Sequence, residues 1–125
     1  MLSMLLAGAL QGLAPGSANA HGEHEPKYGG IIGRTSDDIV VELVVDKGVV
    51  SLYIEDETAP IPSDKVKGTL TLVPAQRPRQ EAKLVPAHGN RLTAPGLKPA
   101  PGDKLRAYIV LPNGDEVSSV FLYSK

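Results

Sequence analysis

Two histidines and two glutamates near the N-terminus are the residues of this sequence best suited to chemistry. They are His21, Glu23, His24 and Glu25, within the stretch H-G-E-H-E. Imidazole nitrogens suit Cu(II), Ni(II) and Zn(II), with Cu(II) bound tightest in the usual order of divalent ions, and carboxylates add oxygen donors. The spacing predicts a site for a divalent transition metal, copper or zinc, on a flexible lead-in to the first strand.

The third histidine, His88, stands in a predicted tight turn, His88-Gly89-Asn90. If this turn faces the N-terminal segment from one end of the fold, His88 supplies a third nitrogen ligand. Together with a carboxylate, it would complete a square or tetrahedral site. The alternative is that His88 is exposed in its turn and that the two other histidines belong to a polar extension without a ligand.

The segment before these residues has the features of a secretory signal. An apolar run over residues 2–13 is followed by a Pro-Gly break and by the tripeptide A-N-A ending at Ala20, which fits the A-x-A cleavage pattern. A membrane-spanning helix needs about 20 apolar residues, so the run is too short to span. We therefore expect a periplasmic or secreted protein with no membrane span after cleavage, the alternatives being an uncleaved anchor or a start that lies upstream.

Cleavage after Ala20 would make His21 the first residue of the mature chain. Its α-amine and its imidazole could then close one chelate ring on a metal. An imidazole has a pKa near 6.5 and an α-amine one of about 7.7–8.0, so a metal must displace protons to bind. Affinity is expected to fall steeply between pH values of about 7 and 5.

Composition narrows the function classes. The chain has 13 basic and 14 acidic residues and a net charge of −1. This balance argues against nucleic-acid binding, which needs a basic face. The chain contains no cysteine, which excludes lipoprotein processing and disulfides, so an exported domain must rest on its apolar core.

Catalytic motifs are missing from the sequence. It contains no cysteine nucleophile, no G-x-S-x-G, no H-E-x-x-H and no phosphate-binding P-loop. The acidic pairs Asp37-Asp38 and Asp56-Glu57 stand at predicted strand ends, where they are interpreted as solvated turn residues. We predict that the protein is not an enzyme; an oxidative copper enzyme, in particular, needs an aromatic-rich surface that this sequence does not offer.

Short β-branched and aliphatic runs separated by Gly, Pro, Asn and Asp predict the elements that carry these residues. The predicted fold is all-β, an immunoglobulin-like two-sheet antiparallel sandwich of about seven to eight strands. We expect a signal peptide over residues 1–20, the His/Glu-rich lead-in over 21–28 and one sandwich domain over 29–125. The predicted strands are Gly29–Arg34, Asp38–Val45, Gly48–Ile54, Lys67–Val73, Glu81–Pro86, Arg91–Thr93, Lys104–Leu111 and Glu116–Tyr123.

Turn residues and alternation fix the expected pairing and the expected core. Hairpins are predicted at Asp46-Lys47-Gly48 and at Asn113-Gly114, where glycine and asparagine tolerate positive φ. A proline-rich crossover is expected over residues 95–102. Alternation predicts an inward face composed of Val41, Leu43, Val45, Leu52, Ile54, Leu70, Leu72, Leu105, Ala107, Ile109 and Leu111.

Four stretches, taken in order, resemble a periplasmic β-sandwich module. They are H-G-E-H-E-P-K-Y-G-G-I-I, D-I-V-V-E-L-V-V-D-K-G-V-V-S-L-Y-I-E-D-E-T-A-P-I-P, K-G-T-L-T-L-V and A-K-L-V-P-A-H-G-N-R-L. The module is similar to the N-terminal domain of heavy-metal efflux membrane-fusion (adaptor) proteins and to related small secreted proteins. The resemblance implies periplasmic metal handling or efflux support, with His21 and His24 matching the family's His-rich lead-in.

The same resemblance implies efflux-system or other envelope proteins as partners. Because no lipoyl-like halves or coiled-coil hairpin follow the sandwich, we do not expect this chain to bridge an efflux pump by itself. A further analogy, with small immunoglobulin-like periplasmic carriers that bind Cu(II) through an N-terminal histidine, rests on architecture alone. The alternative function is an envelope interaction or structural module that docks through a sandwich edge or loop face, and the oligomeric state stays open.

Overall fold

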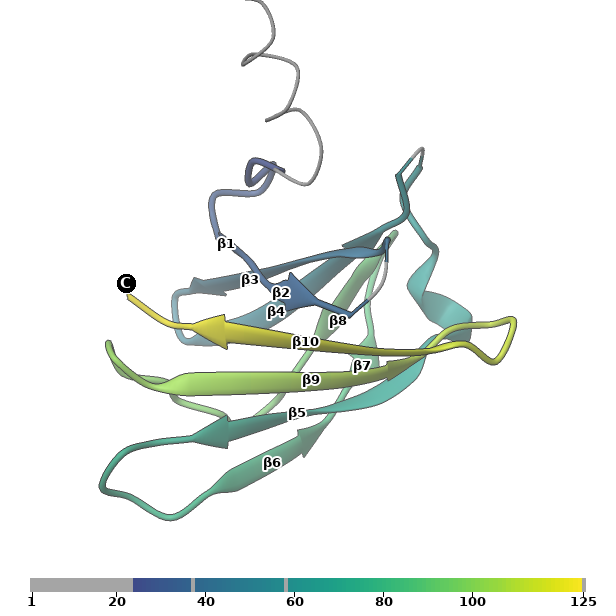
Figure 1. The fold of residues 1–125 in the computed structure, drawn as a ribbon. Coiled ribbons are helices and arrows are strands. Elements are labelled where there is room, and N and C mark those ends of the chain that lie inside the picture. The colour runs from purple at the N-terminus through teal and green to yellow at the C-terminus, as the bar shows by residue number, and fades with distance from the viewer. Residues whose placement is uncertain (1–23, 37, 58, 125) are drawn as a thin grey trace, which may run out of the picture.

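The computed structural model describes residues 24–36, 38–57 and 59–124 (Figure 1). Within these ranges the chain forms two antiparallel sheets of five strands each, with one 3-10 helix, η2 (Ser63–Lys65). None of the helices in this part of the chain is long and apolar enough to cross a membrane. The prediction of an all-β, two-sheet sandwich is confirmed.

Each sheet consists of one edge strand followed by two pairs of neighbouring strands, and the strands of each pair are consecutive in the chain. The first sheet runs, in spatial order, β1 (Ile31–Ile32), β3 (Val40–Asp46), β4 (Val49–Glu55), β8 (Arg91–Thr93) and β7 (Val85–Pro86). The second runs β2 (Arg34–Thr35), β10 (Glu116–Leu122), β9 (Lys104–Val110), β5 (Lys67–Val73) and β6 (Gln80–Lys83). Consecutive strands β1 and β2 thus form the edges at one side, and β6 and β7 the edges at the other.

The core lies between the sheets and is built by the alternation visible in the sequence. Leu105, Ala107 and Ile109 of β9 are completely buried, as are Leu70 and Leu72 of the neighbouring β5. The predicted inward residues of the first sheet are also buried, apart from Val45, which is partly buried against the core. Burial of each large apolar side chain contributes about 1.5–3 kcal/mol, so this set stabilises the fold by tens of kcal/mol before the chain entropy lost on folding is subtracted.

Two of the predicted strands prove to be divided between the sheets. The segment predicted as Gly29–Arg34 forms β1 in one sheet and β2 in the other, and the segment predicted as Glu81–Pro86 forms β6 and β7. At the first crossing Gly33 is required, because a Cβ there would lie 2.1 Å from Ser119 Oγ. At the second, Leu84 is buried and its N–H donates to the carbonyl of Gly68 at 2.9 Å.

These crossings also make the edge strands of the sandwich short. The four edge strands are two, two, four and two residues long. Short edge strands limit edge-to-edge pairing between molecules, because few backbone groups in a row are left without partners.

The two predicted hairpins are present, with different turns. Lys47 and Gly48 alone connect β3 to β4, with φ angles of 53° and 81°, as a type I′ turn requires. Between β9 and β10 the loop is longer: the N–H of Leu111 donates to the carbonyl of Asp115 at 2.9 Å, and Gly114 has a φ of 93°. This is a three-residue loop closed by a glycine in the left-handed region.

A buried carboxylate holds the end of the proline-rich crossover. Asp103 Oδ2 accepts the N–H of Ala100 at 2.8 Å and pairs with Arg77 Nη2 at 2.7 Å. The hydrogen bond from Ala100 and then the one from Arg77 lower the pKa of Asp103 below its ordinary value.

Candidate functional site

A single glutamate in the middle of β3 fixes the chain that precedes the first strand. Glu42 points away from the core, yet it is only 3% exposed because residues 27–30 lie over it. Its carboxylate accepts three backbone N–H groups, from Lys27 at 2.8 Å, Tyr28 at 2.9 Å and Gly30 at 2.7 Å. We call residues 27–30 the anchor segment, since these bonds attach it to the outer face of the first sheet.

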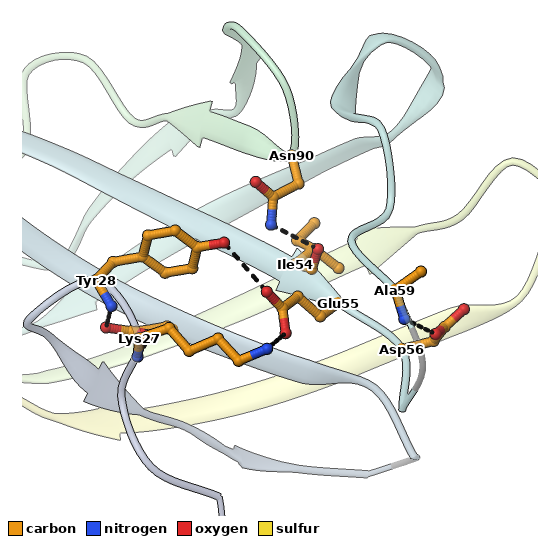
Figure 2. A network of polar contacts seen from close by, with 8 residues as sticks. Lys27, Tyr28, Ile54, Glu55, Asp56, Ala59 and Asn90 are labelled. Carbon is orange, nitrogen blue, oxygen red and sulfur yellow. Dashed lines mark hydrogen bonds and ion pairs between the residues drawn. The ribbon is translucent and has the colours of Figure 1, made fainter.

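A second buried glutamate, Glu55 at the end of β4, binds the side chains of the same segment (Figure 2). Lys27 Nζ lies 2.9 Å from Glu55 Oε1, and the hydroxyl of Tyr28 donates to Oε2 at 3.1 Å. The hydrogen bond and charge of Glu55 raise the pKa of Lys27 above its ordinary value. The Tyr28 ring stacks on Tyr53 with centroids 3.9 Å apart and planes 9° apart.

The anchor segment determines where the candidate metal ligands lie. Lys27 and Tyr28, which the sequence analysis places in the flexible lead-in, are bonded to the sheet. His24 and Glu25, just upstream, line a cavity of about 120 Å³ against the sheet. The same cavity is lined by Glu42, Tyr53, Glu55, Asp56 and Glu57.

The cavity has a strongly acidic lining. Five carboxyl side chains contribute to it, against one lysine, Lys27, and one histidine, His24. Carboxylates gathered on one concave surface lower the local potential and raise the local concentration of cations. An imidazole beside carboxylates is a donor set that accepts divalent transition metals.

The remaining predicted ligands are placed as follows. His21 and Glu23 lie outside the described residues. His88 is in the predicted turn, which is confirmed: Gly89 has a φ of 70°, and Asn90 Nδ2 donates to the carbonyl of Ile54 at 3.0 Å (Figure 2). The turn therefore lies at the end of β4, but His88 does not line the cavity that holds His24. Across residues 24–36, 38–57 and 59–124, no three His, Asp or Glu side chains are placed to hold one metal ion.

Sequence reasoning missed the two glutamates that organise this face. Glu42 was visible as the single acidic residue inside the apolar run I-V-V-E-L-V-V. A single carboxylate with apolar residues on both sides in a strand can be buried only if other groups of the protein donate hydrogen bonds to it. No comparable signal marks Glu55, which ends its strand beside other acidic residues.

Comparisons of the chain with family models, with curated proteins and with solved structures find no match.

Proposed function

We propose that the protein is an exported binding protein for a divalent transition metal, copper or zinc, with a role in metal handling or efflux. The observation that carries the proposal is the position of His24 and Glu25, which line one acidic cavity with Glu57 on the outer face of the first sheet. The anchor segment fixes the chain immediately after these donors, so they project from a rigid surface.

The proposed ligand set combines nitrogen and oxygen donors from a short stretch of chain. After cleavage behind Ala20, the α-amine and imidazole of His21 bind the metal together with the imidazole of His24. Glu23 and Glu25 add oxygen donors. The described residues alone provide no three-ligand cluster, so the proposal depends on His21 and on its free amine.

The acidic cavity supports this proposal by its charge. Loading a divalent cation beside several carboxylates is favoured because the cation relieves their mutual repulsion. Protonation of the imidazoles and of the amine opposes binding, so release at low pH is expected. A metal carrier needs both properties.

The test begins with the exported protein. Mass spectrometry fixes the mature N-terminus, which we expect at His21. Calorimetric titration with Cu(II) and with Zn(II) at pH values of about 7 and 5 then measures binding, and we expect it to weaken at the lower pH.

Substitutions identify the ligands. We expect His21→Ala and His24→Ala each to weaken binding by about tenfold or more, as the loss of one donor does. His88→Ala is the matched control, because His88 does not line the cavity, and it should leave affinity unchanged. Absence of binding to either metal, or binding unaffected by both N-terminal substitutions, would refute the proposal.

A further inference from the structure

A groove of about 410 Å³ lies at the side of the sandwich where the chain crosses from β1 to β2. Its apolar lining comes from both sheets: Ile31 and Ile32 from β1, and Val120, Phe121 and Leu122 from β10. Arg34 and Lys104 complete it. Leu122 is 64% exposed, the most exposed of the large apolar side chains in the described part of the chain.

The backbone of β10 is open at Leu122, beside this groove. β2 pairs with β10 only through Ser119 and Val120, and the carbonyl of Ser118 accepts the N–H of Ser36. Tyr123 directs its N–H to the opposite side, toward Asp103. Because the backbone direction alternates along an antiparallel strand, the N–H and C=O of Leu122 point to the side that β2 has left.

The edge of the first sheet faces the same groove. The N–H of Gly33 donates to the carbonyl of Val41 at 2.9 Å, so Gly33 directs its backbone toward β3. Ile32, the preceding residue, therefore directs its backbone away from β3. The groove thus has one open backbone position on each side, at Leu122 and at Ile32, beside exposed apolar side chains. A short extended peptide could pair with such a position by strand addition.

The charges indicate which peptide fits. Lys104 is directly opposite Leu122 in the β9–β10 ladder, and Arg34 is directly opposite Val120 in the β2–β10 ladder. The two ion pairs found among the described residues are Lys27–Glu55 and Arg77–Asp103, so neither groove cation is in an ion pair there. An added strand beside Leu122 would place alternate side chains on the face that carries Lys104 and Arg34, and the others on the side of the interior between the sheets.

We propose that this groove binds an extended segment of a partner protein in which acidic residues alternate with apolar ones. A second copy of this chain fits less well, because symmetric pairing of two β10 edges would bring Arg34 and Lys104 close to their own copies. An anionic membrane would satisfy the cations, but it offers no strand to the backbone of Leu122. The groove and the acidic cavity that contains His24 are adjacent, since Ile32 lines both, but peptide binding does not depend on the proposed metal ligands.

The test uses synthetic peptides and the whole exported protein. The probe is a fluorescently labelled eight-residue peptide that alternates valine with glutamate, and fluorescence polarisation measures its binding. A peptide with lysine in place of glutamate should bind about tenfold or more weakly, because it loses charge-assisted contacts. A valine–glutamate peptide that is N-methylated at alternate residues should also lose at least about tenfold, because it cannot form the ladder.

Protein variants locate the binding. Leu122→Pro removes the N–H that faces the groove, at an edge position where proline is compatible with a strand. Lys104→Glu reverses one groove charge, and Lys83→Glu, on the opposite edge strand β6, is its matched control. We expect the first two variants to weaken the probe by about tenfold and the control to bind normally, with far-UV circular dichroism verifying that each is folded.

Several outcomes would overturn this proposal. One is no binding of the valine–glutamate peptide, and another is equal binding of its N-methylated form, which would reduce the contact to charge alone. A third is binding of phosphatidylglycerol vesicles without binding of the peptide, which would indicate a lipid surface. A fourth is a dimer that Lys104→Glu disrupts in the absence of any peptide binding.

Discussion

Removal of the Glu42 carboxylate tests how the anchor segment is held. Glu42→Ala deletes the acceptor of three hydrogen bonds of 2.7–2.9 Å that reach the sheet from Lys27, Tyr28 and Gly30. The nearest residues on the same face of β3, Val40 and Val44, have no acceptor group in their side chains. The segment must either retain unpaired N–H groups against the sheet or leave it.

The expected cost follows from these two choices. Hydrogen bonds to a charged group contribute about 1.5–3 kcal/mol each, so three of them amount to about 4.5–9 kcal/mol. If the segment detaches, its N–H groups are hydrated and its four residues regain about 1–2 kcal/mol each of backbone entropy. Stacking of Tyr28 on Tyr53 adds about 0.5–1.5 kcal/mol to the loss. At the midpoints of these ranges the losses exceed the regained entropy, and the net decrease in the free energy of unfolding is about 2 kcal/mol, or about 8–16 °C in Tm.

Urea unfolding followed by far-UV circular dichroism measures this decrease, and amide hydrogen exchange locates it. In Glu42→Ala the amides of Tyr28 and Gly30 should exchange much faster, while those of the β9–β10 hairpin keep their order of protection. Glu81→Ala, which removes an exposed carboxylate from β6, is the control and should have little effect. A midpoint equal to that of the control, or continued protection of both amides, would show that Glu42 does not hold the segment.

Four other expectations are open to simple measurement. The folded-state pKa of Asp103 is lowered, so the unfolded chain binds more protons than the folded one below a pH of about 4. The stability contributed by this carboxylate is therefore present above that pH and is lost as the pH falls through the folded pKa. Asp103→Asn should therefore flatten the acid limb of urea midpoints measured from about pH 6 to 2.5, and an unchanged slope would contradict this. Gly33→Ala should cost about 1–3 kcal/mol in the same assay, since its Cβ would lie 2.1 Å from Ser119 Oγ. Lys47→Asn should stabilise by up to about 1 kcal/mol, because Lys47 has a φ of 53° that asparagine tolerates better; a lower midpoint would argue against the type I′ turn. Glu55→Gln should lower the pKa of Lys27 toward 10.5, as read by NMR titration, and a pKa that does not move would exclude Glu55 as the cause.

Alternation in the sequence predicted the core because a strand with one buried face has an apolar residue at every second position. Leu105, Ala107 and Ile109 are buried as that period requires. The same period cannot tell which of two sheets a segment joins, so the crossings at Gly33 and Leu84 were read as continuous strands. Close packing around Gly33 depends on Ser119 and Phe121, which are far away in sequence.

The candidate site was accessible to sequence reasoning only in part. Histidine and glutamate can be recognised as possible metal ligands from residue type alone. His24 and Glu25 line one cavity in the structure. The support beneath them was not foreseen, because it depends on which backbone N–H groups reach Glu42 across more than ten residues of chain. The role of a buried acceptor depends on the groups that donate to it, and the tertiary fold determines which groups these are.

Residues 31–35 and 80–86 each belong to both sheets, and this ties the alignment of one sheet to that of the other. A strand that slipped by one residue on one side of Gly33 would turn its side chains over and, at the same time, drag its neighbour out of place in the facing layer. Such an error would lose packing and hydrogen bonds in both sheets, so misaligned forms should be rare during folding. For the same reason the chain should not yield two separately stable halves when cut, and a nick in either crossing segment should loosen both layers together.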